Sequence, residues 1–455
     1  MNKIIRKINS GFFVALIIFI VSFDSAVSQQ SLTIDQALNT AIQNNLDLSS
    51  IQNNLSIQEQ NIRRSKGSLL PSLSLTGRWT KNNTYSNGGI IFQNGVPISI
   101  PSESRWSDDF QLGLSSNITL FDGFANYRLV DLEEQNISTY RLQFEKQKTD
   151  IVINVTQAFY EVLKNEQIVL TNEQNLATSK AQLELVREYF NVGKRTLADI
   201  YRQDVQVAQD ELALQRSVNV LEKSKVDLLS ALNDDVNKNI RAESSGINVN
   251  LSESELQRIL NENRNLDLLV RKGIEDRYDY KSSLNQIELN KIRLDIATKN
   301  LYFPTVSGFA NYNMNGSAID DITNTRTASF GISLNYPIFQ GFSKDVDRQI
   351  AEVNIKQRQL DLSKLELQIR TEIKKAILDL ENAYNQVVIL DRNIRSAEQD
   401  KLLSEENYRL GLGTLLDVQT ATTRLNNLLI DKINATYNFL IAKRLIDYYS
   451  GQIKY

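Results

Sequence analysis

The residues that interrupt helices are confined to short stretches of this 455-residue chain. The segment from Phe124 to Ser245 contains one glycine, Gly193. The segment from Phe342 to Ser450 contains two, Gly411 and Gly413. Neither segment contains proline, because the prolines lie in two other windows, as Pro71, Pro97, Pro101, Pro304 and Pro337. Since Pro and Gly stop helices, each segment is predicted to form two long helices joined by one turn.

Apolar residues in the first segment recur with the spacing of a coiled coil. Every seventh residue of one series is apolar, and the series is Val162, Val169, Leu176, Leu183 and Phe190. A helix from Phe124 to Phe190 would contain about 67 residues and extend on the order of 100 Å, at 1.5 Å per residue. Few globular domains accommodate a helix of that length.

The two proline windows show the alternation of β-strands. Leu73, Leu75, Gly77 and Trp79 alternate with small or polar residues, and residues 110–120, 306–314 and 330–338 follow the same rule. Period two over about ten residues is typical of a strand, so we predict hairpins at about 72–121 and about 305–339. The connections, 82–109 and 315–325, are rich in Asn, Ser, Gly and Asp, and we expect loops in water there.

The chain repeats itself. A shift of 218 residues aligns Phe121-Asp122-Gly123-Phe124 with Phe339-Gln340-Gly341-Phe342, and it also aligns residues 193–199 with residues 411–417 without a gap. The predicted order, helix, hairpin and long helical pair, therefore occurs twice. We assign residues 29–233 to the first repeat, with its tip at about 191–199, residues 234–251 to a linker, and residues 252–455 to the second repeat, with its tip at about 409–417.

Residues 1–28 are predicted to be a signal peptide. Lys3, Arg6 and Lys7 precede an apolar run at residues 12–21, and Ala26-Val27-Ser28 supplies small residues for cleavage. An anchoring helix is the alternative, but the run is about half of the roughly 20 residues that cross a bilayer.

Composition removes several classes of function. The chain has no His and no Cys, which excludes zinc sites and catalytic nucleophiles built on them, as well as disulfides. A formal net charge of −3 gives no basic face for nucleic acid. Acidic pairs such as Asp234-Asp235 lie in a polar stretch and are expected to be solvated. We therefore expect neither an enzyme nor a cofactor.

Four strands per chain cannot close a barrel, and an open sheet edge in lipid would leave backbone groups unpaired. If these strands span a membrane, several copies must form one ring. Ordinary globular domain doubling is the alternative explanation of the repeat. Aromatic residues at strand ends also have an alternative role, because they cap soluble sheets. The aromatic residues predicted to meet the lipid interface are Trp79, Trp106, Tyr336 and Phe339.

Four motifs in this order resemble the TolC-type outer-membrane efflux proteins. They are Leu32-Thr33-Ile34-Asp35-Gln36-Ala37-Leu38 with Asn44-Asn45, Leu70-Pro71-Ser72-Leu73, Leu120-Phe121-Asp122-Gly123, and the duplicated Gly-x-x-Thr-Leu-x-Asp turns. The resemblance implies a mainly α fold with a transmembrane β-barrel. A homotrimer would pool twelve strands in outer-membrane lipid and form a long periplasmic α-helical barrel. The resemblance also implies that the protein is an exit channel for an inner-membrane pump of the RND, ABC or MFS type, and that a periplasmic adaptor protein joins the channel to the pump.

The turns between the long helices allow two interpretations. As structure, Gly193 and Gly411 end helices in a left-handed conformation, while Thr196 and Thr414 begin the next helices as capping boxes with Asp199 and Asp417. In the family, these turns are the periplasmic tips that an adaptor contacts and that close the tube. The residues predicted to contact an adaptor are Val192, Gly193, Lys194, Thr196, Leu197, Leu410, Gly411, Leu412, Thr414 and Leu415.

The resemblance also suggests a gate at the entrance. Tyr408 matches the family's constriction tyrosine, and Asp417 matches the first of two acids in a ring. Thr420 replaces the second acid, which would leave three carboxylates in a trimer instead of six and weaken cation attraction. Gly413 stands where an arginine often bonds the neighbouring turn, and Arg195, the matching residue of the first repeat, is the candidate substitute. The predicted gate residues are Tyr408, Asp417, Thr420, Gly413, Arg195 and Asp199.

A structural coiled-coil stalk or adhesin anchored in the outer membrane is the alternative function. It would have filled apolar seams, whereas Asn165, Asn172 and Lys401 interrupt the seams here. The sequence does not identify the cargo.

Overall fold

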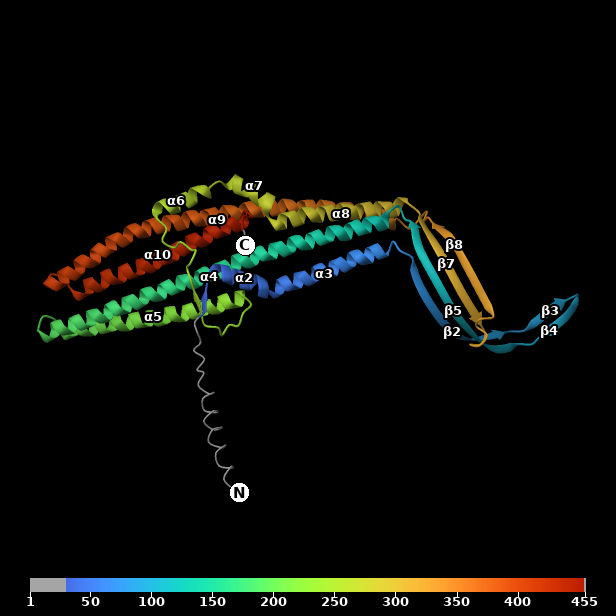
Figure 1. Cartoon of the computed structure of the whole chain (residues 1–455), viewed down its shortest axis with the longest axis horizontal. Helices are drawn as coiled ribbons and strands as arrows, with labels where there is room; N and C mark the ends of the chain where they lie inside the picture. The colour runs from blue at the N-terminus through green and yellow to red at the C-terminus, as the bar shows by residue number, and fades with distance from the viewer. Residues whose placement is uncertain (1–29, 454–455) are drawn as a thin grey trace, which may run out of the picture. The chain divides into compact units, whose positions relative to one another are not determined.

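The computed structural model describes residues 30–453, so the predicted signal peptide lies outside the described residues. Most of this part of the chain is helical (Figure 1). The helices are α2 (Ile34–Asn44), α3 (Leu46–Gly67), α4 (Ala125–Asn191), α5 (Leu197–Ala231), α6 (Glu253–Glu262), α7 (Leu266–Asp276), α8 (Tyr278–Tyr302), α9 (Ser343–Leu410) and α10 (Leu415–Tyr449). The strands are β1 (Gln30–Leu32), β2 (Ser72–Ser86), β3 (Gly89–Gln93), β4 (Val96–Ile100), β5 (Glu103–Phe121), β6 (Ile240–Ala242), β7 (Thr305–Gly316) and β8 (Thr325–Asn335).

The two repeats match in the lengths of their long helices. Helices α4 and α9 contain 67 and 68 residues, and helices α5 and α10 contain 35 each. The long first helix predicted from Phe124 to Phe190 is confirmed to within one residue at each end. Within residues 30–453, no helix combines the length and the apolar character needed to cross a membrane.

Contacts divide the described chain into two units, and each unit takes residues from both repeats. Unit 1 comprises residues 30–49, 145–277 and 367–453, and unit 2 comprises residues 50–144 and 278–366. Unit 1 has the larger buried core, with fully buried residues such as Phe159, Val162, Leu380 and Phe439. The predicted linker contains strand β6, which pairs in parallel with β1. Buried Ile240 anchors this strand.

Unit 2 contains an antiparallel four-stranded sheet in the order β2-β5-β7-β8. Strands β2 and β8 are its edges, and within the described chain neither has a second partner. Strand β8 ends at Asn335, earlier than the predicted hairpin, because Pro337 cannot donate a backbone hydrogen bond to a ladder.

The register gives the sheet one apolar and one polar face. Rows such as Leu75↔Leu114 and Leu114↔Tyr312 place large apolar side chains on one face. The alternate rows place small and polar side chains on the other face, as at Ser74↔Ser115. The apolar side chains are exposed to an unusual degree, with Phe330 at 88%. A face of this kind needs a non-aqueous environment or another chain.

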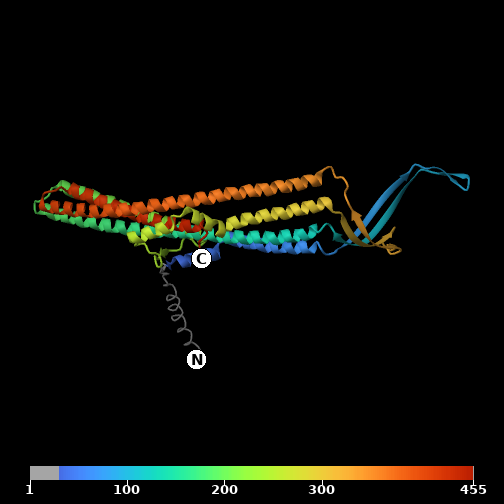
Figure 2. The same cartoon turned by 90° about the horizontal axis from the view of Figure 1, so that it is seen from above.

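Most of residues 82–109 are exposed, but the expectation that they form a loop is wrong. Strands β2 and β5 continue to the pair Ser86↔Glu103, and a second hairpin, β3–β4, follows. Figures 1 and 2 show this hairpin continuing outward from the β2–β5 ribbon. Its turn is Asn94-Gly95, with φ of 52° and 82°, which is the preferred sequence of a two-residue hairpin turn. β-branched and aromatic residues on both sides of this turn outweigh the loop-like composition.

Candidate gate at the helical tips

Each tip in unit 1 is a glycine stop followed by a capping box. Gly193 and Gly411 have φ of 74° and 78°, a region in which other residues are strained. The Thr414 side chain accepts a hydrogen bond from Asp417 N at 3.3 Å, and Asp417 Oδ2 accepts one from Thr414 N at 2.8 Å. Thr196 and Asp199 form the same box in the first repeat. The structural interpretation of the turns is therefore confirmed.

The capping box also sets the charge of Asp417. The backbone N–H of Thr414 lowers the pKa of the Asp417 carboxyl below its usual value, and the Thr414 hydroxyl contributes further. Since the side chain is exposed, its carboxylate is ionised at neutral pH while it faces solvent.

The two tips pack against each other through an apolar cluster. Val186 of α4, Tyr408 of α9, and Leu415 and Val418 of α10 are each at most 3% exposed. Tyr189 and Ile200 complete the contact from the first repeat. The cluster therefore joins the end of the first helical pair to the end of the second within one chain.

Arg195 binds Tyr408 in two ways. Its Nη2 donates a hydrogen bond to the Tyr408 backbone carbonyl, and its guanidinium carbon lies 3.7 Å from the centre of the Tyr408 ring. The carbonyl belongs to the last turn of α9 and also accepts a hydrogen bond from Gly411 N at 3.1 Å, so Arg195 is a second donor to this oxygen. Arg195 thus supplies positive charge at a helix C-terminus and a cation–π contact at once.

Tyr408 itself is almost completely enclosed, with 2% of its surface exposed. Its hydroxyl has no hydrogen-bond partner among the described residues. Burial raises the pKa of this hydroxyl, although the charge of Arg195 opposes the rise. Within one chain the side chain lies between the two tips, and its role in a constriction of the assembled channel stays a prediction.

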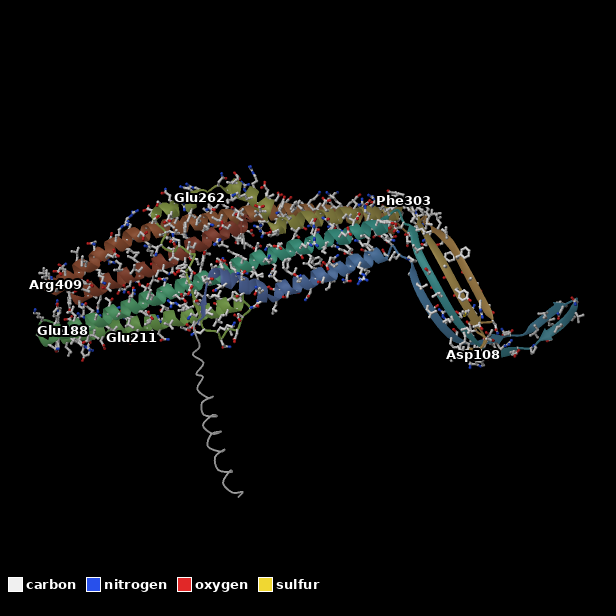
Figure 3. All side chains as sticks on the ribbon, viewed as in Figure 1. Asp108, Glu188, Glu211, Glu262, Phe303 and Arg409 are labelled. Carbon is white, nitrogen blue, oxygen red and sulfur yellow. The ribbon has the colours of Figure 1, made fainter. Side chains whose placement is uncertain are left out.

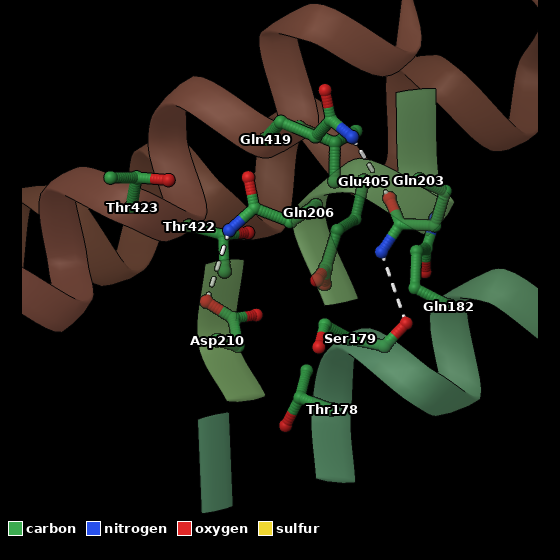
Figure 4. A pocket seen from close by; sticks show the side chains of 11 residues that line it. Thr178, Ser179, Gln182, Gln203, Gln206, Asp210, Glu405, Gln419, Thr422 and Thr423 are labelled. Carbon is green, nitrogen blue, oxygen red and sulfur yellow. Dashed lines mark hydrogen bonds between the residues drawn. The ribbon is translucent and has the colours of Figure 1, made fainter. Parts of the chain in front are cut away.

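A polar layer follows the apolar cluster along the helices. Gln203 of α5 is 2% exposed and donates to Ser179 O on α4 at 3.0 Å. Gln419 of α10 donates to Gln203 Oε1 at 3.0 Å. Figure 4 shows these bonds in a pocket that is also lined by Gln206, Asp210 and Glu405. One buried amide therefore connects three helices from both repeats.

The polar layer leaves only a weak signal in the sequence. Its signal is a single polar residue in an otherwise apolar series on α5, formed by Ile200, Gln203 and Val207. The partner Gln419 could not be found in the same way, because it lies 216 residues away.

The structure separates the predicted tip residues into exposed and buried ones. Leu415 is 1% exposed and belongs to the apolar cluster, so in this conformation it is not available to an adaptor. Its counterpart Leu197 is 49% exposed. Gly413 packs against Asn407, and a Cβ there would lie 3.2 Å from the Asn407 Cβ. The remaining exposed positions are Val192, Gly193, Lys194, Thr196, Leu410, Gly411, Leu412, Thr414 and Thr420. Figure 3 labels Glu188 and Arg409, which precede the two turns.

The predicted interface aromatics do not lie at one level of the sheet. Trp79 is 62% exposed, and its Nε1 donates to Asp108 Oδ1 at 3.0 Å. Trp106 lies on the same face but four residue pairs further out, opposite Asn83. Tyr336 and Phe339 are exposed in the connection from β8 to α9. Figure 3 labels Asp108 near the outer end of the sheet and Phe303 where α8 meets β7.

The chain matches the sequence model of one family, described as outer membrane efflux protein, over residues 37–234 and 293–452. The outer membrane protein TolC of Escherichia coli K12 is 23% identical over 400 residues, which cover 84% of this chain and 74% of TolC. The outer membrane efflux protein BepC of Brucella suis is 22% identical over 428 residues, 90% of this chain and 83% of BepC. The crystal structure of the outer membrane protein VceC from Vibrio cholerae is similar with a TM-score of 0.72 at 16% identity, over 92% of this chain and 96% of VceC.

Proposed function

The chain belongs to the outer membrane efflux protein family, and from this premise we propose how its parts form and gate an exit channel. The protein is an efflux channel of the outer membrane. In our proposal, it conducts solutes that an inner-membrane pump delivers through a periplasmic adaptor. This role requires no bond to be made or broken by the protein.

The observation that carries the channel proposal is the sheet of unit 2. One of its faces is apolar and exposed, the other is polar, and both edge strands lack partners within the described chain. In lipid, an unpaired edge is costly, so β2 of one copy pairs with β8 of the next in our proposal. Three copies then form a closed ring of twelve strands with a polar interior.

A helix in the same unit supports assembly independently. Val346, Ile350, Val353 and Leu360 follow one face of α9 at helical spacing, and each is 47–61% exposed. An apolar stripe of this length on a single chain is typical of a helix that packs against another helix. A neighbouring copy is the partner that cyclic symmetry provides.

The tips are the proposed gate and adaptor surface. The contact between Arg195 and Tyr408 holds the two helical pairs together, and an adaptor that separates them would open the entrance. Tip opening is then a change between two packed states of a coiled coil. The exposed positions at both turns, including Leu197 and Leu412, are the proposed adaptor contacts.

Single-channel recording in planar bilayers tests this proposal. Purified mature protein should insert as a trimer and give an ohmic pore. Correctly inserted trimer that leaves the bilayer insulated, even after disruption of the tips, would support the stalk alternative and contradict transport.

A further inference from the structure

The hairpin β3–β4 at the outer end of the chain is apolar on both faces. Residues 87–102 contain no charged side chain. The register places Ile91 and Ile98 on one face, and Phe92 and Pro97 on the other. The large side chains are all exposed, with Ile90 at 67%, Ile91 at 49%, Phe92 at 74%, Val96 at 61%, Ile98 at 41% and Ile100 at 41%. A two-stranded hairpin of this composition is marginal in water and needs a partner on both faces.

The ribbon that carries this hairpin extends beyond the rest of the sheet. Strand β5 pairs with β7 only as far as Phe110↔Gly316. The β2–β5 pairing continues for seven more residue pairs, to Ser86↔Glu103. At about 3.3 Å per residue, the ribbon extends about 23 Å past β7, and five-residue strands add about 17 Å.

The joint between ribbon and hairpin is packed and specific. Gly88 has φ of +69°, and a Cβ there would lie 2.5 Å from Ile100 O and 2.7 Å from Ser102 N. Only glycine fits such a position, so the direction of the hairpin is fixed by the backbone. Pro101 lies beside Gly88 in the connection from β4 to β5, and its fixed φ limits the joint further.

We propose that the three β3–β4 hairpins of a trimer pack against one another above the barrel mouth and form an outer lid. This inference rests on the proposed trimer. Cyclic symmetry brings one face of each copy against a different face of the next, and the hairpin has two different apolar faces. Twelve strands spaced about 4.8 Å apart and tilted about 40° enclose a ring about 24 Å across, so the ribbon and hairpin are long enough to reach its axis.

A second copy suits the hairpin better than a membrane does. In lipid, the outer edges of β3 and β4 would leave backbone groups unpaired. The polar turn Gln93-Asn94-Gly95 would also have to enter the bilayer ahead of the apolar residues. The adjacent ribbon carries Asp108 and Asp109 and offers no basic cluster to anionic headgroups. In the trimer, each hairpin has a neighbour on both faces.

Cysteine cross-linking in the full-length protein tests the lid, because the chain has no cysteine of its own. The double variant Phe92→Cys with Ile98→Cys places thiols on opposite faces of the hairpin. Oxidation in outer membranes should yield a covalent trimer on a non-reducing gel. The matched control Asn82→Cys with Asn83→Cys, on opposite faces of the ribbon near its base, should remain monomeric on the same gel.

Access to the lumen gives a second readout. Thr327 lies on the polar face of β8, so Thr327→Cys reports entry from outside. A bulky, membrane-impermeant maleimide should label this cysteine several-fold faster when residues 87–102 are replaced by Asn-Gly.

Three results distinguish the lid from the proposed channel. An intact trimeric pore with no cross-link and unchanged labelling overturns the lid and leaves the channel standing. Protection of Phe92→Cys from the maleimide without a cross-link also overturns it, in favour of lipid contact. Absence of any trimer in the unmodified protein overturns the proposed function itself.

Discussion

Replacing Arg195 should loosen the two tips of each chain. The guanidinium contributes a cation–π contact of about 0.5–2 kcal/mol and a charge-assisted hydrogen bond of about 1.5–3 kcal/mol. Because Arg195 is half-buried, water screens both contacts, and the lower ends of these ranges apply. Their sum is about 2 kcal/mol per chain, which corresponds to about 30-fold in the equilibrium between joined and separated tips.

Single-channel recording of Arg195→Ala in planar bilayers measures this effect. We expect a higher conductance or a larger open fraction than in the unmodified channel. Arg195→Lys should have an intermediate effect, because an ammonium keeps the positive charge but lacks the planar, forked group that stacks on Tyr408 while it donates to the carbonyl. Arg187→Ala is the matched control, since Arg187 lies near the end of α4, just before the turn that carries Arg195, and pairs with exposed Glu184.

The pH dependence sharpens the test. Burial raises the pKa of the Tyr408 hydroxyl, so the hydroxyl stays neutral below its usual titration range. The difference in conductance between Arg195→Ala and the unmodified channel should therefore be the same at about pH 6 and about pH 8. A conductance that Arg195→Ala and Arg187→Ala leave equally unchanged would refute the assignment of Arg195 as the contact that holds the tips.

Three further changes follow from the same unit. Gln203→Ala removes the amide that binds Ser179 O, and thermal unfolding by circular dichroism should show a loss of about 1–3 kcal/mol, whereas an unchanged midpoint would mean that the polar layer adds no stability. Glu166→Gln should stabilise the protein at neutral pH, because burial raises the pKa of Glu166. The folded state of the unmodified protein thus loses stability as the pH rises through that pKa. The difference in stability between Glu166→Gln and the unmodified protein should vanish below pH 4.5, the ordinary pKa of a glutamate in the unfolded chain. Thr420→Asp should strengthen block by divalent cations in bilayer recordings, because it adds a second carboxylate near Asp417. Equal block in both channels would show that position 420 does not face the entrance.

The parts of the fold that depend on local rules could be predicted from the sequence. Gly193 and Thr196 mark the first tip unambiguously, since one requires a left-handed backbone and the other caps the next helix. The 218-residue repeat then transfers these boundaries to the second half. Local rules do not predict the location in the outer membrane or the function in efflux. Both came from the family resemblance, which the match over most of the chain confirms.

The features that depend on distant contacts were missed. The β3–β4 hairpin is a different case, because its signal is local: the Asn94-Gly95 turn between β-branched and aromatic residues favours a hairpin, and the loop-like composition of the wider segment concealed it. The burial of Leu415 and the exposure of Leu197 differ although the two residues occupy the same place in the repeat. Their environments are set by packing between the tips, which a repeated sequence motif does not encode.

The closely matched lengths of the paired helices, 67 and 68 residues for α4 and α9 and 35 each for α5 and α10, restrict how such a chain can change. One residue added within α4 would rotate every later side chain by about 100° and advance the turn by about 1.5 Å, while α9 stayed in place. Arg195 would then no longer face Tyr408, and Gln203 would lose Gln419. A viable insertion or deletion in one long helix therefore calls for a compensating one in the other, so the halves are expected to gain or lose whole turns in concert.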